Sequence, residues 1–135
     1  MNWKLTLAAI AFALPVQAQQ FTTAAEIKPI LSATKANWVA VREYDGQDLL
    51  YFTHLLAWRC GLEEIHYTVN GGEEKLWQGE PCYETEAQPN AIKATDSLPF
   101  ITFPLSSVET VSLRLLYDDG TQDTASFERA AIKMP

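Results

Sequence analysis

The sequence has few cysteines, few histidines and little positive charge. Among its 135 residues are two cysteines, two histidines and ten Lys and Arg, against 17 Asp and Glu. A zinc site usually takes three or four protein ligands, and the sequence has no such set at a spacing typical of zinc sites. Phosphate backbones and anionic membranes are bound through Lys and Arg, so we expect no nucleic-acid partner and no membrane-surface role.

Catalytic and cofactor motifs are also missing. The chain contains neither a Gly-x-Ser-x-Gly elbow nor a Gly-rich phosphate loop. Glu64 and His66 share a strand face but lack a third ligand. Asp118, Asp119 and Asp123 lack the EF-hand spacing and are explained as turn formers. We therefore predict no catalytic residues, no metal and no cofactor.

No segment is apolar over the roughly 20 residues that a membrane helix needs. The apolar run from Leu5 to Leu14 follows Lys4 and precedes small residues at Val16 and Ala18, a pattern typical of a secretory signal peptide. We predict a signal peptide at 1–18 and a single exported domain at 19–135, periplasmic or secreted, with no membrane insertion after cleavage. The alternative is a buried N-terminal helix.

The two cysteines that remain are Cys60 and Cys82, about 22 residues apart. In an oxidising compartment an even pair usually bonds, and closing this loop would contribute about 3 kcal/mol. The alternative is a reactive Cys60 with His54 or His66 as its base, but the surrounding residues match no catalytic family signature.

Helix signals are confined to 21–35. Thr23 followed by Glu26 fits a capping box, whereas Pro29 sits too deep for the first turn and should break or kink a helix. We expect a short N-terminal helix or an irregular arm.

Strand signals dominate from residue 37 onward. Residues 38–44 are β-prone and end at the Asp45-Gly46 turn. Residues 49–58 are apolar at both parities, which predicts a central strand buried on both faces or a buried helix. Their aromatic content favours a strand. Residues 65–69 alternate, Asn70-Gly71-Gly72 should turn the chain, and 73–78 should return beside them.

The second half of the chain alternates between irregular and regular patterns. Residues 79–98 are irregular, and 99–103 read as a strand near a sheet edge because Pro104 follows. Residues 108–117 alternate and lead into a three-residue loop with Gly120 in the left-handed conformation. That loop sets the register of the last hairpin, pairing Tyr117 with Thr121, Leu113 with Ala125 and Val111 with Phe127.

About seven short strands predict a mainly β fold. We expect a small immunoglobulin-like or fibronectin type III-like β-sandwich with a short N-terminal helical or irregular arm. The spacing of Cys60 and Cys82 is too short for the inter-sheet bridge of an antibody-type domain. Architecture of this kind hosts many functions and selects none.

The functional prediction depends on charge and on four side chains. Without Lys4 the domain has nine Lys and Arg against 17 Asp and Glu, a net charge of −8, which would steer a basic protein towards it or serve solubility alone. Trp77 and Tyr83 are candidate anchors, with core packing as the alternative, and Glu73 and Glu74 are candidate acidic contacts.

We therefore predict an exported, non-enzymatic binding or accessory domain, with a basic protein as its partner. The alternatives are a small periplasmic hydrolase, with a site built from His54 or His66 and a carboxylate, and a structural or assembly subunit that uses its sheet edges. The sequence leaves the oligomeric state open.

Overall fold

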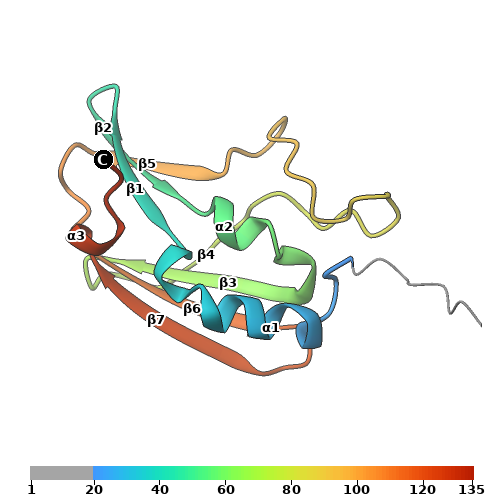
Figure 1. The fold of residues 1–135 in the computed structure, drawn as a ribbon. Helices are drawn as coiled ribbons and strands as arrows, with labels where there is room; N and C mark the ends of the chain where they lie inside the picture. Colours follow the sequence, from blue (N-terminus) through green and yellow to red (C-terminus); the bar gives the residue numbers. More distant parts are fainter. Residues whose placement is uncertain (1–19) are drawn as a thin grey trace, which may run out of the picture.

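A computed structural model describes residues 20–135, which form two antiparallel sheets (Figure 1). The first sheet has the order β1–β2–β5 and the second β4–β3–β6–β7. The strands are β1 (Ala40–Tyr44), β2 (Gln47–Tyr51), β3 (Leu62–Val69), β4 (Lys75–Leu76), β5 (Phe100–Pro104), β6 (Thr110–Tyr117) and β7 (Gln122–Glu128). The mainly β fold is confirmed, and the two sheets are consistent with a β-sandwich.

Five short helical segments accompany the sheets. They are α1 (Ala24–Ala33), η1 (Lys35–Asn37), α2 (Thr53–Leu56), η2 (Arg59–Gly61) and α3 (Arg129–Ile132). Figure 1 shows α1 running alongside the four-stranded sheet, and its buried Ile27 and Leu31 belong to the same hydrophobic core as Leu113 and Leu115 of β6. The core is therefore closed by both sheets and by α1.

The first helix forms as its capping residues predict. Thr23 is the N-cap, and its hydroxyl accepts a hydrogen bond from the backbone N–H of Glu26. The Glu26 carboxylate reaches back to the N–H of Phe21. The expectation that Pro29 breaks the helix is wrong, because α1 continues for four residues beyond it. Pro29 is exposed, so its ring meets solvent while Ile27 and Leu31 anchor the opposite face.

The expectation of one long strand over 49–58 is also wrong. β2 ends at Tyr51, and Thr53–Leu56 turns into α2. The backbone N–H of Phe52 donates to the carbonyl of Pro99, and the consecutive Leu55 and Leu56 are both buried. One helical turn buries both leucines against the core, which accounts for apolar residues at both parities. β2 itself is the central strand of its sheet.

The predicted hairpins are confirmed. Asp45 and Gly46 both have positive φ, as do Asn70 and Gly71, so both turns have the left-handed geometry that matches strand twist. In the last hairpin Gly120 has a φ of 84°. The register is the predicted one, with Leu113 opposite Ala125, Val111 opposite Phe127, and the Tyr117 N–H bonded to the Thr121 carbonyl at 2.8 Å.

The remaining predicted segments lie where expected. β5 is at the edge of the three-stranded sheet, and β4 returns beside β3. Residues 77–99 contain neither helix nor strand. The predicted signal peptide, 1–18, lies outside the described residues. Within 20–135, no helix combines the length and the hydrophobicity required to cross a membrane.

Candidate functional site

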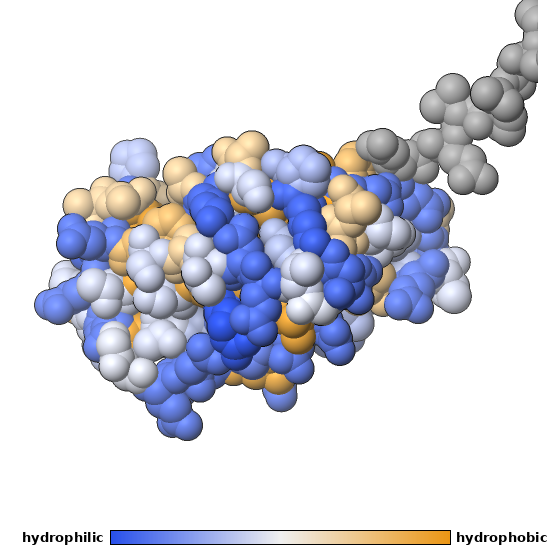
Figure 2. All heavy atoms as spheres, turned by 90° about the horizontal axis from the view of Figure 1, so that it is seen from below, coloured by the Kyte–Doolittle hydropathy of each residue, from blue (hydrophilic) through white to orange (hydrophobic). Residues whose placement is uncertain are grey.

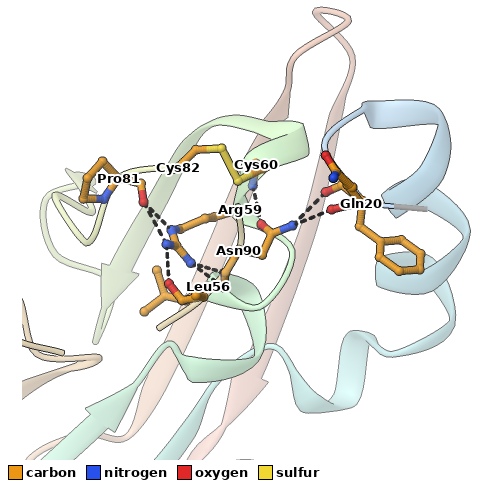
Figure 3. Close-up of a disulfide and its surroundings, with 9 residues drawn as sticks. Gln20, Leu56, Arg59, Cys60, Pro81, Cys82 and Asn90 are labelled. Atoms are coloured by element: carbon orange, nitrogen blue, oxygen red, sulfur yellow. Dashed lines mark hydrogen bonds between the residues drawn. A yellow bond between two sulfur atoms is a disulfide. The ribbon is translucent and has the colours of Figure 1, made fainter. Parts of the chain in front are cut away.

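A disulfide ties the irregular loop 77–99 to the body of the domain. Cys60, in η2, is bonded to Cys82 (Figure 3). The disulfide therefore closes a loop that contains β3, β4 and the first part of the irregular segment. It connects that loop at a 3-10 turn, and not at the end of a long strand as the sequence suggested.

Arg59 holds this loop through hydrogen bonds to backbone carbonyls. It is 94% buried, with a relative exposure of 6%. Its Nε and Nη2 donate to the carbonyl of Pro81 at 2.9 and 2.8 Å. The other three guanidinium hydrogens are donated to the carbonyls of Leu56, Asn90 and Ala91, each within 2.9 Å. All five donors are satisfied by backbone, so one buried cation organises three chain segments.

Asn90 extends this network to the N-terminal arm. Its Oδ1 accepts from the N–H of Cys60 at 2.8 Å, and its Nδ2 donates to the carbonyls of Gln20 and Phe21 (Figure 3). The amide thus connects the disulfide, the loop and the entrance to α1.

Glu80 is a second buried charge in the loop. Its carboxylate accepts from the Tyr83 hydroxyl at 2.5 Å and from the N–H groups of Lys93 and Ala94. Burial alone would raise the pKa of Glu80, but these donors outweigh it and lower that pKa. The bond to Glu80 raises the pKa of Tyr83 to about 12. Lys93 Nζ lies 4.0 Å from the centre of the Tyr83 ring. Tyr83 is therefore part of the loop's internal network.

A groove of about 460 Å³ separates this loop from β3. We call it the acidic groove; its wall on the sheet side is Leu62, Glu63 and Glu64, and its other wall is 76–82. At one end the two walls are joined by the hydrogen bond from the Trp77 N–H to the Ile65 carbonyl. At the other end they are joined by the disulfide. No backbone hydrogen bond joins 78–80 to another described residue, so these peptide groups stay free along the groove.

Of the four predicted partner-binding residues, Trp77, Tyr83, Glu73 and Glu74, only Trp77 lines this groove. Trp77 lines it while stacking on Phe52, with ring centroids 4.1 Å apart, and its Nε1 is buried without a partner among the described residues. Glu73 and Glu74 are exposed beside the β3–β4 turn. Glu74 pairs with Arg114, which lowers the pKa of Glu74.

The two histidines are held in different ways. The His54 Nε2 lies 2.8 Å from Thr34 Oγ1, and that hydroxyl donates to the Ile30 carbonyl. The imidazole must therefore donate to Thr34, which rules it out as a base toward this hydroxyl. His66 lies between Glu64 and Glu74, at 2.6 and 3.4 Å, with carboxylates as its partners. Neither arrangement activates a hydroxyl or thiol nucleophile.

The three aspartates of the last hairpin also bind protein donors. Asp118 accepts from the Ala24 N–H, Asp119 pairs with Lys28, and Asp123 pairs with Lys35. Across 20–135, no group of three or more His, Cys, Asp or Glu side chains is placed to hold a metal ion.

Most Lys and Arg side chains in the described part of the chain already have partners within the molecule. Of the nine Lys and Arg in the described part of the chain, six are in ion pairs and Arg59 is buried on carbonyls, which leaves Arg42 and Lys75. Eight exposed acids have no ion pair with a described residue: Asp45, Glu63, Glu73, Glu84, Asp96, Glu109, Asp118 and Glu128. Hydrophilic residues also dominate the centre of the face seen in Figure 2.

No local sequence pattern indicated Arg59, Glu80 or Asn90. Each is a polar residue whose role depends on loop carbonyls and amides that come together only in the fold. The position of Arg59 beside Cys60 was the one local signal, and it does not distinguish a buried arginine from an exposed one.

Comparison with protein-family models, with curated proteins and with solved structures finds no significant match to this chain.

Proposed function

We propose that this protein is an exported, non-enzymatic binding domain that holds a basic segment of another protein in the acidic groove. The observation that carries the proposal is the groove itself: Glu63 and Glu64 line one wall, beside apolar Leu62 and Trp77, and free peptide groups run along the other. A lysine or arginine side chain offers both a cation and an apolar stem to such a lining.

The charges around the groove favour a cationic ligand. At the inner end, the buried Arg59 and Glu80 offset each other. Of the two other acids that line the groove, Glu63 has no ion pair among the described residues, whereas Glu64 is held by His66 at 2.6 Å. Glu73 adds a further exposed carboxylate from the β3–β4 turn. Because the surface has few free cations of its own, a basic partner would be steered to it, with a rate that falls as salt is added.

The strand order supports the finer fold proposal, an immunoglobulin-like or fibronectin type III-like sandwich. In the proposed assignment, β1, β2 and β5 correspond to strands A, B and E, and β3, β6 and β7 to strands C, F and G. β4 then corresponds to a short C′ strand. The disulfide-tied loop occupies the stretch of chain between C′ and E, so the acidic groove is built on an insertion beside the sheet.

Two peptides test the binding function: an extended peptide of alternating arginine and valine, and the same peptide with glutamate in place of arginine. Titration calorimetry at about 20 mM and about 300 mM salt should show binding of the basic peptide alone, and weaker binding at the higher salt. The double variant Glu63→Gln/Glu64→Gln should lower its affinity about tenfold.

The matched control is Glu109→Gln/Glu128→Gln, which removes the same charge at the opposite end of β6 from the groove. It should change the affinity less than twofold. Equal losses in both double variants would mean that diffuse charge, and not the groove, attracts the peptide. Failure of the basic peptide to bind at low salt would reject the proposal.

A further inference from the structure

A second groove, of about 690 Å³, runs along β1 and α2, and its lining is mostly hydrophobic. We call it the apolar groove; its apolar lining includes Trp38, Ala40, Tyr51, Ala57, Ile92 and Met134. Its volume lies in the range of small-molecule sites, which run from about 300 to 1,000 Å³. It shares no lining residue with the acidic groove.

One end of the apolar groove carries positive charge. Arg42 and Met134 line the groove and also an adjoining hollow, of about 560 Å³, that contains Lys133. Glu43 is the one acidic side chain among the residues lining this hollow, and it is already held by Arg129 at 2.7 Å and by Lys133 at 3.5 Å. Arg42 forms no ion pair with any carboxylate of the described chain, including the terminal carboxylate of Pro135. Its guanidinium lies over the Tyr44 ring. In a domain of net charge −8, Arg42 is therefore a cation without an ion pair to any described residue.

The other end of the groove is neutral. Ala40 pairs with Tyr51 and Arg42 with Leu49, so Arg42 and His54 lie on opposite sides of the Ala40–Tyr51 pair. His54 donates to Thr34, and burial lowers its pKa, which keeps the imidazole uncharged at neutral pH. The apolar part of a ligand could therefore bind at this end of the groove without displacing water from a charged side chain.

We propose that the apolar groove binds a small amphipathic anion, a molecule with a hydrocarbon body and one carboxylate or similar acidic head. The body lies between Tyr51, Ala57 and Ile92, and the head pairs with Arg42. Charge complementarity selects this ligand, because Arg42 is the one Lys or Arg lining the apolar groove and has no ion pair with a described residue. This site is independent of the acidic groove and of the function proposed for it.

The probes are decanoate, decanol and decyltrimethylammonium, which share an apolar chain and differ in the charge of the head. Each is titrated into the oxidised protein, and binding is followed by calorimetry and by ¹H–¹⁵N NMR. We expect decanoate to bind about tenfold more tightly than decanol, the cation to bind weakest, and shifts to concentrate in residues 38–42 and 51–57. Arg42→Gln should remove the preference for decanoate while leaving decanol binding unchanged.

Lys75→Gln is the matched control, because Lys75 is the other unpaired cation of the described chain and lines neither the groove nor the hollow. It should leave all three affinities unchanged. Ala40→Phe should block decanoate and decanol alike, and Tyr51→Ala gives a second test if that variant does not fold. No binding, equal affinity for decanoate and decanol, tighter binding of the cation, or shifts centred elsewhere would overturn the proposal. The peptide experiment reports separately on the acidic groove.

Discussion

At the scale of single residues, two buried charges join parts of the chain that are distant in sequence. Arg59 does so through carbonyls, and Asp48 through a bidentate pair with Arg129 at 2.6 and 3.1 Å. Asp48 also accepts from the N–H groups of Ser106 and Val108, each at 3.0 Å. It therefore links β2, the β5–β6 loop and α3, and its exposure is 0%.

Asp48→Asn should lower the free energy of unfolding by about 3 kcal/mol, because it replaces the buried carboxylate that binds Arg129 at two atoms and leaves Arg129 only its pair with the exposed Glu43. The bond to Arg129 lowers the pKa of Asp48 to about 2, below its value near 3.9 in an unfolded chain. The carboxylate therefore stabilises the fold fully above the unfolded-state pKa, and this contribution is lost as the pH falls towards 2. Urea unfolding between pH 7 and pH 2 should show a steeper loss for the natural protein than for the variant.

Asp45→Asn is the control for this measurement. Asp45 is exposed, unpaired and in the turn that precedes β2, and asparagine tolerates its positive φ. Its substitution should change stability by less than about 0.5 kcal/mol. Parallel pH profiles for the natural protein and Asp48→Asn would contradict the role given to the ion pair.

At the scale of an element, α1 is held by packing in spite of a residue that opposes helix formation. Pro29 cannot donate the helical hydrogen bond to the carbonyl of Ala25, four residues earlier. Burial of Ile27 and Leu31, together with the Thr23 cap, compensates for it.

Pro29→Ala should therefore stabilise the protein, by about 1–2 kcal/mol. Proline is about 3 kcal/mol less favourable than alanine inside a helix, and the greater freedom of alanine in the unfolded chain offsets part of this gain. Thermal unfolding followed by circular dichroism would measure the change. Ser32→Ala, also exposed in α1, should add only about 0.5 kcal/mol. A lower stability for Pro29→Ala would show that the proline ring makes a stabilising contact.

At the scale of the whole molecule, the disulfide joins a regular body to an irregular loop. The sheets and α1 share one core, on which Trp77 and Ile92 of the loop also pack. The rest of 77–99 is held by Cys82, Arg59 and Glu80. The acidic groove lies at this boundary, so its shape depends on the loop's attachment.

The double variant Cys60→Ser/Cys82→Ser should lose about 3 kcal/mol of stability, since the closed loop has a sequence separation of 22. Hydrogen exchange should speed up most in 77–99, while the β6–β7 hairpin stays the better protected part. Basic-peptide binding should weaken with it. Uniform loss of protection over the domain would contradict this division into body and loop.

The β6–β7 hairpin could be predicted from residues that are close together in the sequence. Its alternation, its turn residues and Gly120 agree on one register, and the fold contains that register. Residues 49–58 show the limit: an apolar run at both parities fits a central strand and a helical turn equally well, and contacts of Phe52 with Pro99 and Trp77 decide where the strand ends. The candidate sites were the least predictable part, because Trp77 could be named but its groove could not.

The sequence by itself determined the turns, the β6–β7 register, the capped helix, the cysteine pair and the acidic surplus, because each depends on residues adjacent in the chain or on composition alone. The partners of the charged side chains depend on the tertiary structure. It determines which cations form ion pairs, which acids remain unpaired among the described residues, and that Arg42 lines an apolar groove. The physical reason is that a charge acts over distances of a few ångströms in space, and folding brings together partners that lie up to 94 residues apart in the chain.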